Sequence, residues 1–362
     1  MRGTCHRGSS AAMTNKTLIF KKIPTGVPVP GEHLVVEDRG FDADAPPPKG
    51  GVTLEVLYAS YDPYLRGKMR DPKIKSYSPA FELNQPIVND TVARVLKSDT
   101  PNYQPGDLVI AYLPLGEYAT LGADSLNLIR RKLQNPHGLK DLGLFLGPLG
   151  MPGLTGWSSL HEIGQPKKGE TIFISSAAGA VGQVVGQIAK REGLRVIGSV
   201  GSDDKLEFLT KELGFDGGFN YKKEKPADAL DRLAPNGIDI YYENVGGEQL
   251  EAALDKLNTF GRVVTCGMIS QYNLPPEKRY GVKNLFHVVS KRLTMRGFLV
   301  GDPDFGPKYA KDHQEKMQQW LADGSIHAKL HVTEGIDDAA EGLVGMLEGK
   351  NFGKAVLKIK DP

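Results

Sequence analysis

The chain has 362 residues, of which 40% are hydrophobic and 24% are charged, and its formal net charge is +2. This composition is ordinary for a soluble globular protein, and neither the net charge nor any block of Lys and Arg favours a nucleic-acid partner. The length suits two domains better than one, and no apolar segment approaches the roughly 20 residues that span a bilayer.

The chain has two cysteines, Cys5 and Cys266. A disulfide framework is therefore excluded, and we expect a soluble cytoplasmic protein that does not act at a membrane. Residues 1–12 are basic and Ser-rich and lack acids. We interpret them as a tag or leader ahead of Met13 and exclude them from the fold.

The first half of the chain is punctuated by Pro and Gly between short apolar or alternating runs. Residues 52–61 (VTLEVLYASY), 90–98 (DTVARVLKS) and 106–113 (GDLVIAYL) are of this kind, and DAPPPKGG and TPNYQPGD lie between them. This pattern predicts short strands joined by turns, and so a mainly β domain.

From about residue 152 to residue 300, strand-like and helix-like patterns alternate. The predicted strands are residues 171–175, 194–200, 217–221, 238–245, 261–268 and 292–300, and helical patterns fill residues 180–193, 202–214, 225–234 and 248–258. Such alternation is typical of a doubly wound parallel sheet, which makes the chain an α/β protein.

The last part returns to mixed structure. Residues 311–324 predict an amphipathic helix that ends at Gly324, residues 336–350 a second helix, and residues 353–359 a closing strand. We expect this strand to pair with the N-terminal β domain. The predicted division is residues 13–150 and 301–362 for a substrate domain and residues 151–300 for a cofactor-binding domain.

The turn after the predicted strand 171–175 reads AAGAVG, a form of the dinucleotide-binding fingerprint with Ala at its first position. We expect Ala178, Gly179, Ala180, Val181 and Gly182 to hold a pyrophosphate. Glycine lets the backbone approach the phosphates and the helix approach the sheet, and the helix N-terminus supplies free N–H groups. Close packing of small residues alone is the alternative reading.

The end of the next predicted strand indicates which dinucleotide binds. An NAD site carries an acid there for the ribose hydroxyls, whereas this chain has Val200, followed by Ser202 and Lys205, with Tyr221 after the third strand. Lys205 would attract a 2′-phosphate, so we predict NADPH/NADP+ as the cofactor. Asp203 and Asp204 oppose this unless both face water.

The segments YDPYLRGKM, GPLGMPGLTGWSSL, SSAAGAVGQVVGQIAK, GSVGSDDK, FNYK, ENVGG, CGMISQYN and GKNFGKAVLKI are spread from residue 61 to residue 359. Together they resemble the zinc-independent branch of the medium-chain dehydrogenase/reductase superfamily that contains leukotriene B4 12-hydroxydehydrogenase/prostaglandin reductase and the NADPH-dependent alkenal double-bond reductases. The resemblance implies a GroES-like substrate domain, a Rossmann cofactor domain and a homodimer.

A zinc site is not expected. The chain has no cysteine between Cys5 and Cys266, and its eight histidines are scattered. A catalytic zinc needs three protein ligands, so we predict no metal.

Reduction of an activated C=C bond needs a hydride from the cofactor and a donor that stabilises the enolate oxygen. Tyr272 is the predicted donor, because phenol stays protonated at neutral pH and the resemblance implies that the tyrosine of the ISxYN loop lies near the enone oxygen. Tyr64 is the second candidate, and a purely structural role is the alternative for each. Arg66 could serve the cofactor or an ion pair.

Other predicted cofactor contacts lie where the domains meet and at strand ends. They are Met151, Thr155, Asn244, Cys266, Met268 and Asn351, the last by resemblance to a family asparagine, and the loop 78–86 is expected to help shape the substrate pocket. Cys266 is not expected to be a nucleophile, because no motif places a histidine beside it.

We therefore predict an NADPH-dependent reductase of the C=C bond in α,β-unsaturated aldehydes and ketones. The alternatives are an NADPH:quinone reductase, an NADP-dependent hydroxy-eicosanoid dehydrogenase and, as a remote case, a non-enzymatic NADPH-binding protein.

Overall fold

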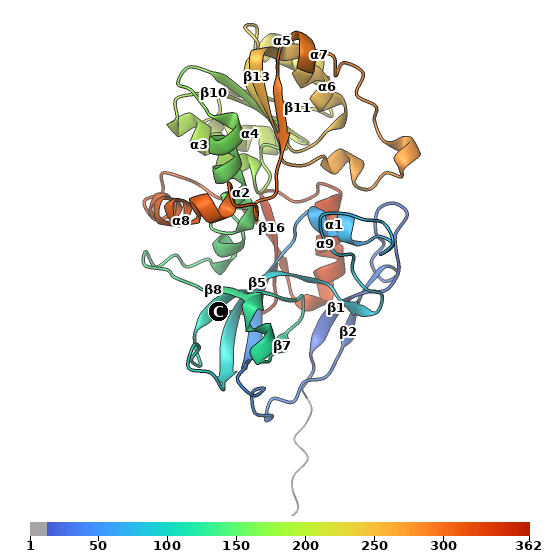
Figure 1. The fold of residues 1–362 in the computed structure, drawn as a ribbon, viewed down its shortest axis with the longest axis vertical. Coiled ribbons are helices and arrows are strands. Elements are labelled where there is room, and N and C mark those ends of the chain that lie inside the picture. The colour runs from blue at the N-terminus through green and yellow to red at the C-terminus, as the bar shows by residue number, and fades with distance from the viewer. Residues whose placement is uncertain (1–12) are drawn as a thin grey trace, which may run out of the picture.

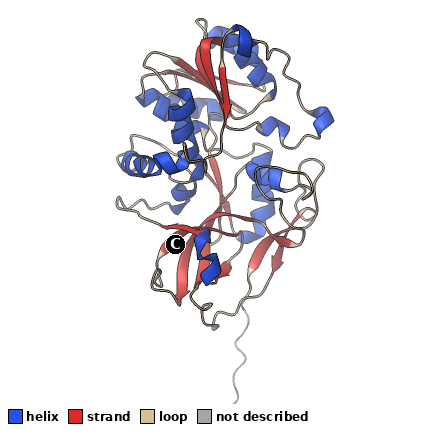
Figure 2. Ribbon diagram, viewed as in Figure 1, coloured by secondary structure: helices blue, strands red, loops and turns tan. Residues whose placement is uncertain are grey.

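The computed structural model describes residues 13–362, which form two lobes stacked along the long axis of the molecule (Figure 1). The prediction for residues 1–12 lies outside the described residues. Strands fill the lobe that contains both the first strand and the C-terminus, and a sheet flanked by helices forms the other lobe (Figure 2). No helix in the described part of the chain is long and apolar enough to cross a bilayer.

The first lobe contains two β-sheets. Its strands are β1 (Lys16–Phe20), β2 (Leu34–Asp38), β3 (Val52–Ser60), β4 (Gln85–Pro86), β5 (Val88–Ser98), β6 (Leu108–Pro114), β7 (Tyr118–Leu121), β8 (Ile129–Lys132), β15 (Leu330–Glu334) and β16 (Lys354–Lys358). One sheet has the order β2-β1-β4, the other has the order β15-β16-β3-β5-β6-β8, and β7 pairs with β3. Two helices, α1 (Tyr64–Lys68) and α9 (Ala339–Leu347), lie on the side of this lobe that faces the other lobe (Figure 1).

The closing strand pairs with the first half of the chain, as expected. Strand β16 runs antiparallel to β3, with Val356 opposite Ser60 and Lys358 opposite Tyr58. Its first four residues are buried because this strand lies inside the sheet, between β15 and β3.

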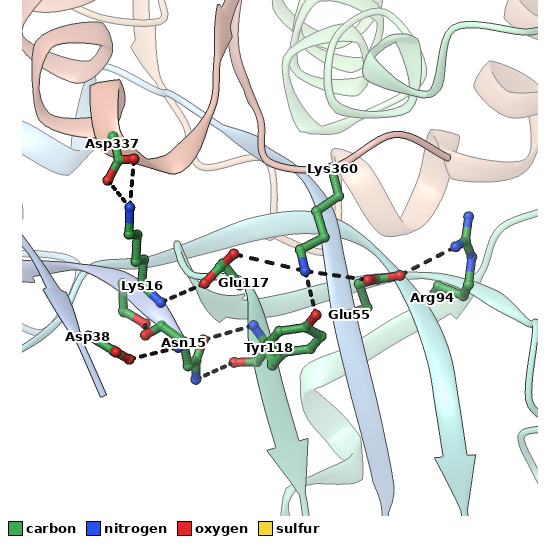
Figure 3. A network of polar contacts seen from close by, with 10 residues as sticks. Asn15, Lys16, Asp38, Glu55, Arg94, Glu117, Tyr118, Asp337 and Lys360 are labelled. Atoms are coloured by element: carbon green, nitrogen blue, oxygen red, sulfur yellow. Dashed lines mark hydrogen bonds and ion pairs between the residues drawn. The ribbon is translucent and has the colours of Figure 1, made fainter. Parts of the chain in front are cut away.

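A polar network joins the two ends of the described chain in this lobe (Figure 3). Lys360 donates to the Tyr118 hydroxyl and lies 3.6 Å from Glu55. The Asn15 side chain exchanges hydrogen bonds of 3.2 and 2.9 Å with the backbone of Tyr118. Tyr118 therefore connects the first strand to the C-terminal segment.

The second lobe is built around one parallel sheet. Its strands are β9 (Thr171–Ile174), β10 (Arg195–Val200), β11 (Gly217–Asn220), β12 (Ile238–Glu243), β13 (Leu257–Thr265) and β14 (Thr294–Gly297). The order is β11-β10-β9-β12-β13-β14, and each neighbouring pair is parallel. The strand order reverses between β9 and β12, and ligands of such sheets bind where strands end at this switch point.

Helices connect these strands and cover the sheet. They are α2 (Met151–Ser159), α3 (Gly182–Arg191), α4 (Asp203–Lys211), α5 (Pro226–Leu233), α6 (Gly247–Lys256), α7 (His287–Ser290) and α8 (Gly306–Ala322). α8 packs on α2, and the Arg191 guanidinium of α3 stacks 4.0 Å from the Trp320 ring of α8. One apolar core runs through both lobes, because Leu57 and Val92 pack in the same cluster as Phe145 and Trp157.

The mixed α/β class with a parallel Rossmann-type sheet and a GroES-like β part is confirmed. The predicted strands and helices between residues 171 and 300 are all present. α8 begins at Gly306, five residues before the predicted start. The domain bounds at residues 150 and 300 stay a prediction; α8, which that division assigns to the substrate domain, packs on α2 of the other lobe.

Candidate active site

The fingerprint turn lies where β9 ends, at the switch point of the parallel sheet. A Cβ on Gly182 would lie 2.5 Å from the Ser176 carbonyl oxygen, so only glycine lets α3 approach the strand this closely. Within the described residues, no backbone acceptor is found for the N–H groups of Val181 and Gly182. The helix N-terminus therefore has free donors for an anion, and the residues fit the pyrophosphate of a dinucleotide.

Buried polar groups hold the ends of β9 and β12 together beneath this turn. The Asn244 side chain donates to the Ser175 carbonyl (2.8 Å), and the Asn244 N–H donates to the Ser175 hydroxyl (2.9 Å). Glu243 Oε1 accepts hydrogen bonds from the N–H groups of Val245 (2.6 Å) and Gly246 (2.8 Å). Burial raises the pKa of Glu243. The predicted cofactor residue Asn244 is thus engaged in shaping the strand ends.

The acids that complicate the NADPH prediction have partners of their own. Asp203 accepts from the Asn220 amide (2.9 Å) and pairs with Lys223, and Asp204 accepts from the Ser202 hydroxyl. Val200 is buried at the end of β10. The end of β10 therefore presents no carboxylate at the ribose position.

Two lysines lie together beyond β10. Lys205 donates to the Gly349 carbonyl oxygen at 3.0 Å. Burial lowers the pKa of Lys205, the charge of Asp204 raises it, and the charge of Lys222 lowers it by a smaller effect. Neither lysine has a carboxylate within ion-pair distance among residues 13–362. The Tyr221 ring covers Gly201, whose Cβ would lie 3.1 Å from the Tyr221 hydroxyl. Two cations that form no ion pair within the described residues favour binding of a dianion.

The C-terminal segment lies against the fingerprint turn. Gly353 forms a parallel bridge with Gly179. Asn351 donates its side-chain amide to the Gly353 carbonyl at 2.7 Å. Gly353 has a φ of +86°, and a Cβ there would lie 2.1 Å from the Lys329 carbonyl oxygen, so only glycine fits. The structure therefore brings Asn351 next to the turn, although its predicted cofactor contact is not tested.

The residues predicted for the nicotinamide side lie on α2 and after β13. The Thr155 hydroxyl donates to the Met151 sulfur at 3.3 Å on the first turns of α2. Cys266 and Met268 follow β13, and the Cys266 N–H donates to the Glu243 carbonyl at 3.0 Å. Burial raises the pKa of the Cys266 thiol to about 12. The thiol is therefore neutral at physiological pH, and a nucleophilic thiolate is not available.

Tyr272 follows the single 3-10 turn Ile269–Gln271. Its hydroxyl oxygen accepts a hydrogen bond from the Met268 N–H at 3.2 Å. Burial raises the pKa of Tyr272, and the bond from Met268 acts in the opposite direction. The hydroxyl proton has no acceptor among the described residues, so this phenol can donate to a ligand.

Tyr64 lies at the start of α1, in the other lobe. Its hydroxyl donates to Asn89 Oδ1, and the Asn89 amide donates to the Ser60 carbonyl (2.8 Å) and to Asp62 (2.9 Å). Burial raises the pKa of Tyr64 far above the ordinary phenol value. The proton of Tyr64 is therefore already engaged, and its catalytic role stays a prediction.

Two further residues approach the site without having been found from the sequence. One is Tyr77, whose charge raises the pKa of Tyr272 and whose own pKa is raised by Cys266, each by a smaller effect than that of burial. The other is Lys222. Tyr77 directly precedes the loop 78–86, and Lys222 is the residue after Tyr221. Their closeness in sequence to predicted site residues is the feature that could have identified them.

The seven histidines within residues 13–362 do not gather with acids or cysteine. Among residues 13–362, no group of three or more His, Cys, Asp or Glu side chains is arranged to hold a metal ion. His33 and His161 instead bond to backbone atoms, the Val29 N–H (3.0 Å) and the Trp157 carbonyl (2.7 Å) respectively.

Comparison with known proteins gives concordant matches over both lobes. The family model described as zinc-binding dehydrogenase matches residues 180–319, and the model described as the N-terminal domain of oxidoreductase matches residues 16–129. The chain is 54% identical to the NADP-dependent oxidoreductase RED1 of Cochliobolus heterostrophus, over 96% of this chain and 98% of that protein. It is 41% identical to the NADP(+)-dependent 2-alkenal reductase of Nicotiana tabacum, over 96% and 98%. The crystal structure of CurA in complex with NADPH from Vibrio vulnificus is 36% identical, with a TM-score of 0.85 over 96% of this chain and 100% of that one.

Proposed function

Because this chain belongs to the zinc-independent alkenal reductase branch of the medium-chain dehydrogenase/reductase superfamily, we propose that it reduces the C=C bond of α,β-unsaturated aldehydes and ketones. It is an NADPH-dependent oxidoreductase. The substrate class and the roles of individual residues in the reaction are part of this proposal.

The bound NADPH supplies a hydride, which goes to the β-carbon of the conjugated substrate. Val181 and Gly182 would hold the pyrophosphate with their free N–H groups, and Lys205 and Lys222 would hold the 2′-phosphate. The absence of a carboxylate at Val200 removes the repulsion that this phosphate would otherwise meet.

One observation carries the proposed chemistry: the Tyr272 hydroxyl accepts a hydrogen bond from Met268 and has a proton free to donate. As the hydride arrives, negative charge builds on the carbonyl oxygen of the substrate. Tyr272 donates to that oxygen, and the Met268 N–H stabilises the charge that the phenol oxygen gains. The α-carbon then takes a proton from water or a nearby hydroxyl.

The experiment compares NADPH with NADH as the reductant for a 2-alkenal, a cyclic enone and a quinone. We expect NADPH oxidation to be fastest with the 2-alkenal or enone and much slower with NADH. Faster turnover of the quinone would favour the quinone reductase alternative. Oxidation of a hydroxy-eicosanoid with NADP+, without enone reduction, would favour the dehydrogenase alternative.

We also propose a homodimer, as the resemblance implies. Strand β14 is at the edge of the parallel sheet, and the nearby side chains of Phe260, Phe286 and Val289 are 66%, 73% and 67% exposed. Apolar side chains beside an open sheet edge favour pairing with another copy. Light scattering of the full chain, with Phe286→Glu as the disrupting variant, tests this assembly.

The cytoplasmic location stays a prediction that cell fractionation would test.

A further inference from the structure

Arg66 is a buried cation without an acidic partner. It lies on α1, two residues after Tyr64, and is 8% exposed. Among residues 13–362, no carboxylate pairs with its guanidinium. A buried charge of this kind is costly unless its donors are satisfied, so its contacts require an explanation.

Its donors bind amide oxygens from separate segments. Nε donates to Asn273 Oδ1 at 3.0 Å, and a terminal nitrogen donates to the carbonyl oxygens of Gly26 (2.8 Å) and Pro24 (3.3 Å). The contact with Asn273 joins the two lobes, because Arg66 is on α1 of one lobe and Asn273 follows β13 of the other. The rigid planar fork of arginine suits several fixed acceptors at once, which a lysine ammonium cannot match.

Asn273 is the residue after Tyr272. The loop that carries both is fixed at its start within its own lobe, because Ile269 and Ser270 donate their N–H groups to the carbonyls of Asn244 and Val245, both at 3.1 Å. Beyond Tyr272, Asn273 binds the other lobe: its Oδ1 accepts from Arg66, and its amide donates weakly to the Leu347 carbonyl at 3.4 Å. Tyr272 thus lies between one anchor in each lobe.

We propose that Arg66 is a positioning residue, which holds the Tyr272 hydroxyl in its productive place through Asn273 and so couples the closure of the two lobes to the donor of the reaction. The inference rests on the proposed function of Tyr272. The proposed role of Arg66 differs from both roles considered from the sequence, which were a contact with the cofactor and an ion pair. A small displacement of a catalytic group is enough to slow a reaction strongly.

Kinetics test the catalytic consequence. We expect Arg66→Gln and Asn273→Leu to lower kcat by about 10- to 100-fold, with an unchanged Kd for NADPH. Asn273→Asp keeps the acceptor for Arg66 and should retain most of kcat. In a Tyr272→Phe background, Arg66→Gln should have little further effect. If Arg66→Gln lowers kcat in the Tyr272→Phe background by the same factor as in the wild type, the coupling through Tyr272 is overturned.

A second readout does not depend on catalysis. In the full chain labelled with 3-fluorotyrosine at its 13 tyrosines, Tyr272→Phe removes one fluorine NMR resonance and so assigns it. We expect Arg66→Gln to move this resonance and Arg39→Gln to leave it in place; Arg39 also donates to a backbone carbonyl, but at the exposed surface. An unmoved resonance in Arg66→Gln would overturn the positioning. A moved resonance together with full activity of Tyr272→Phe would overturn the proposed function and leave the positioning intact.

Discussion

Lys205 Nζ lies 3.0 Å from the carbonyl oxygen of Gly349, so a side chain of the parallel-sheet lobe binds the turn that follows α9 in the other lobe. Lys222 lies nearby and carries the same charge. Burial and the second cation lower the pKa of Lys205, while Asp204 raises it, and a phosphate dianion would further favour the charged form.

Lys205→Ala should therefore weaken binding of NADPH much more than binding of NADH. Loss of one charge-assisted contact costs roughly 1.5–3 kcal/mol, or about one to two decades in Kd. Lys211→Ala is the control, because Lys211 is on the same helix and pairs only with exposed Glu207. Titration of each dinucleotide by calorimetry measures the effect, and equal losses for the two dinucleotides would refute the assignment.

The pH dependence of kcat should be flat through neutrality. Burial raises the pKa of Tyr272 above the ordinary phenol value of about 10, and the protonated phenol is the active form. The loss of activity on deprotonation is therefore shifted to higher pH. We expect constant kcat from about pH 6 to about pH 9 at saturating NADPH. A fall within that range that disappears in Tyr272→Phe would contradict this.

Cys266 should resist alkylation in the native protein. Cys266 is partly buried, and burial raises the pKa of its thiol to about 12, so the reactive thiolate is a fraction of about 10⁻⁴ near pH 8. We expect mass spectrometry to find the Cys266 peptide unmodified by iodoacetamide in the folded chain and modified after denaturation. Rapid native modification with loss of activity would show an accessible thiolate instead.

Disrupting the buried ion pair near the C-terminus should lower the free energy of unfolding more than disrupting a surface ion pair. Lys354 Nζ lies 2.7 Å from Asp62 Oδ1, and the two side chains are 1% and 5% exposed. Lys354→Met leaves a buried carboxylate without its counter-ion, which should cost about 3–5 kcal/mol. Denaturant unfolding measures this loss, and the double variant Lys354→Met/Asp62→Asn should recover part of it.

The matched control for that prediction is Asp337→Asn, which removes the partner of exposed Lys16 (Figure 3). Solvent screens this pair, so we expect no measurable change in unfolding. Equal losses for Lys354→Met and Asp337→Asn would contradict the assigned importance of burial.

The parts of the molecule that could be predicted depend on local sequence. The strand before residue 176, the glycine at 182 and the helix after it form a single local pattern, and apolar periodicity places the remaining strands of the parallel sheet. The presence of an unpartnered closing strand predicted its pairing with the N-terminal β domain, but not that its partner there is β3.

The parts that could not be predicted are contacts between distant segments. Nothing local to Arg66 indicates that its acceptor is Asn273, and nothing local to Tyr64 indicates that its hydroxyl donates to Asn89. The grouping of Lys205 with Lys222 depends on how β10 and β11 align, since Val200 lies opposite Asn220 in their register. Side-chain partners of this kind are decided by the tertiary fold.

The most direct test of the account is the rate of enone reduction by Tyr272→Phe with NADPH. Removal of one oxyanion donor should lower kcat by about 10²- to 10³-fold, while the Kd for NADPH stays unchanged, and Tyr280→Phe should behave as the wild type. A Tyr272→Phe variant that reduces a 2-alkenal at the full rate would contradict the central claim that this phenol stabilises the forming enolate.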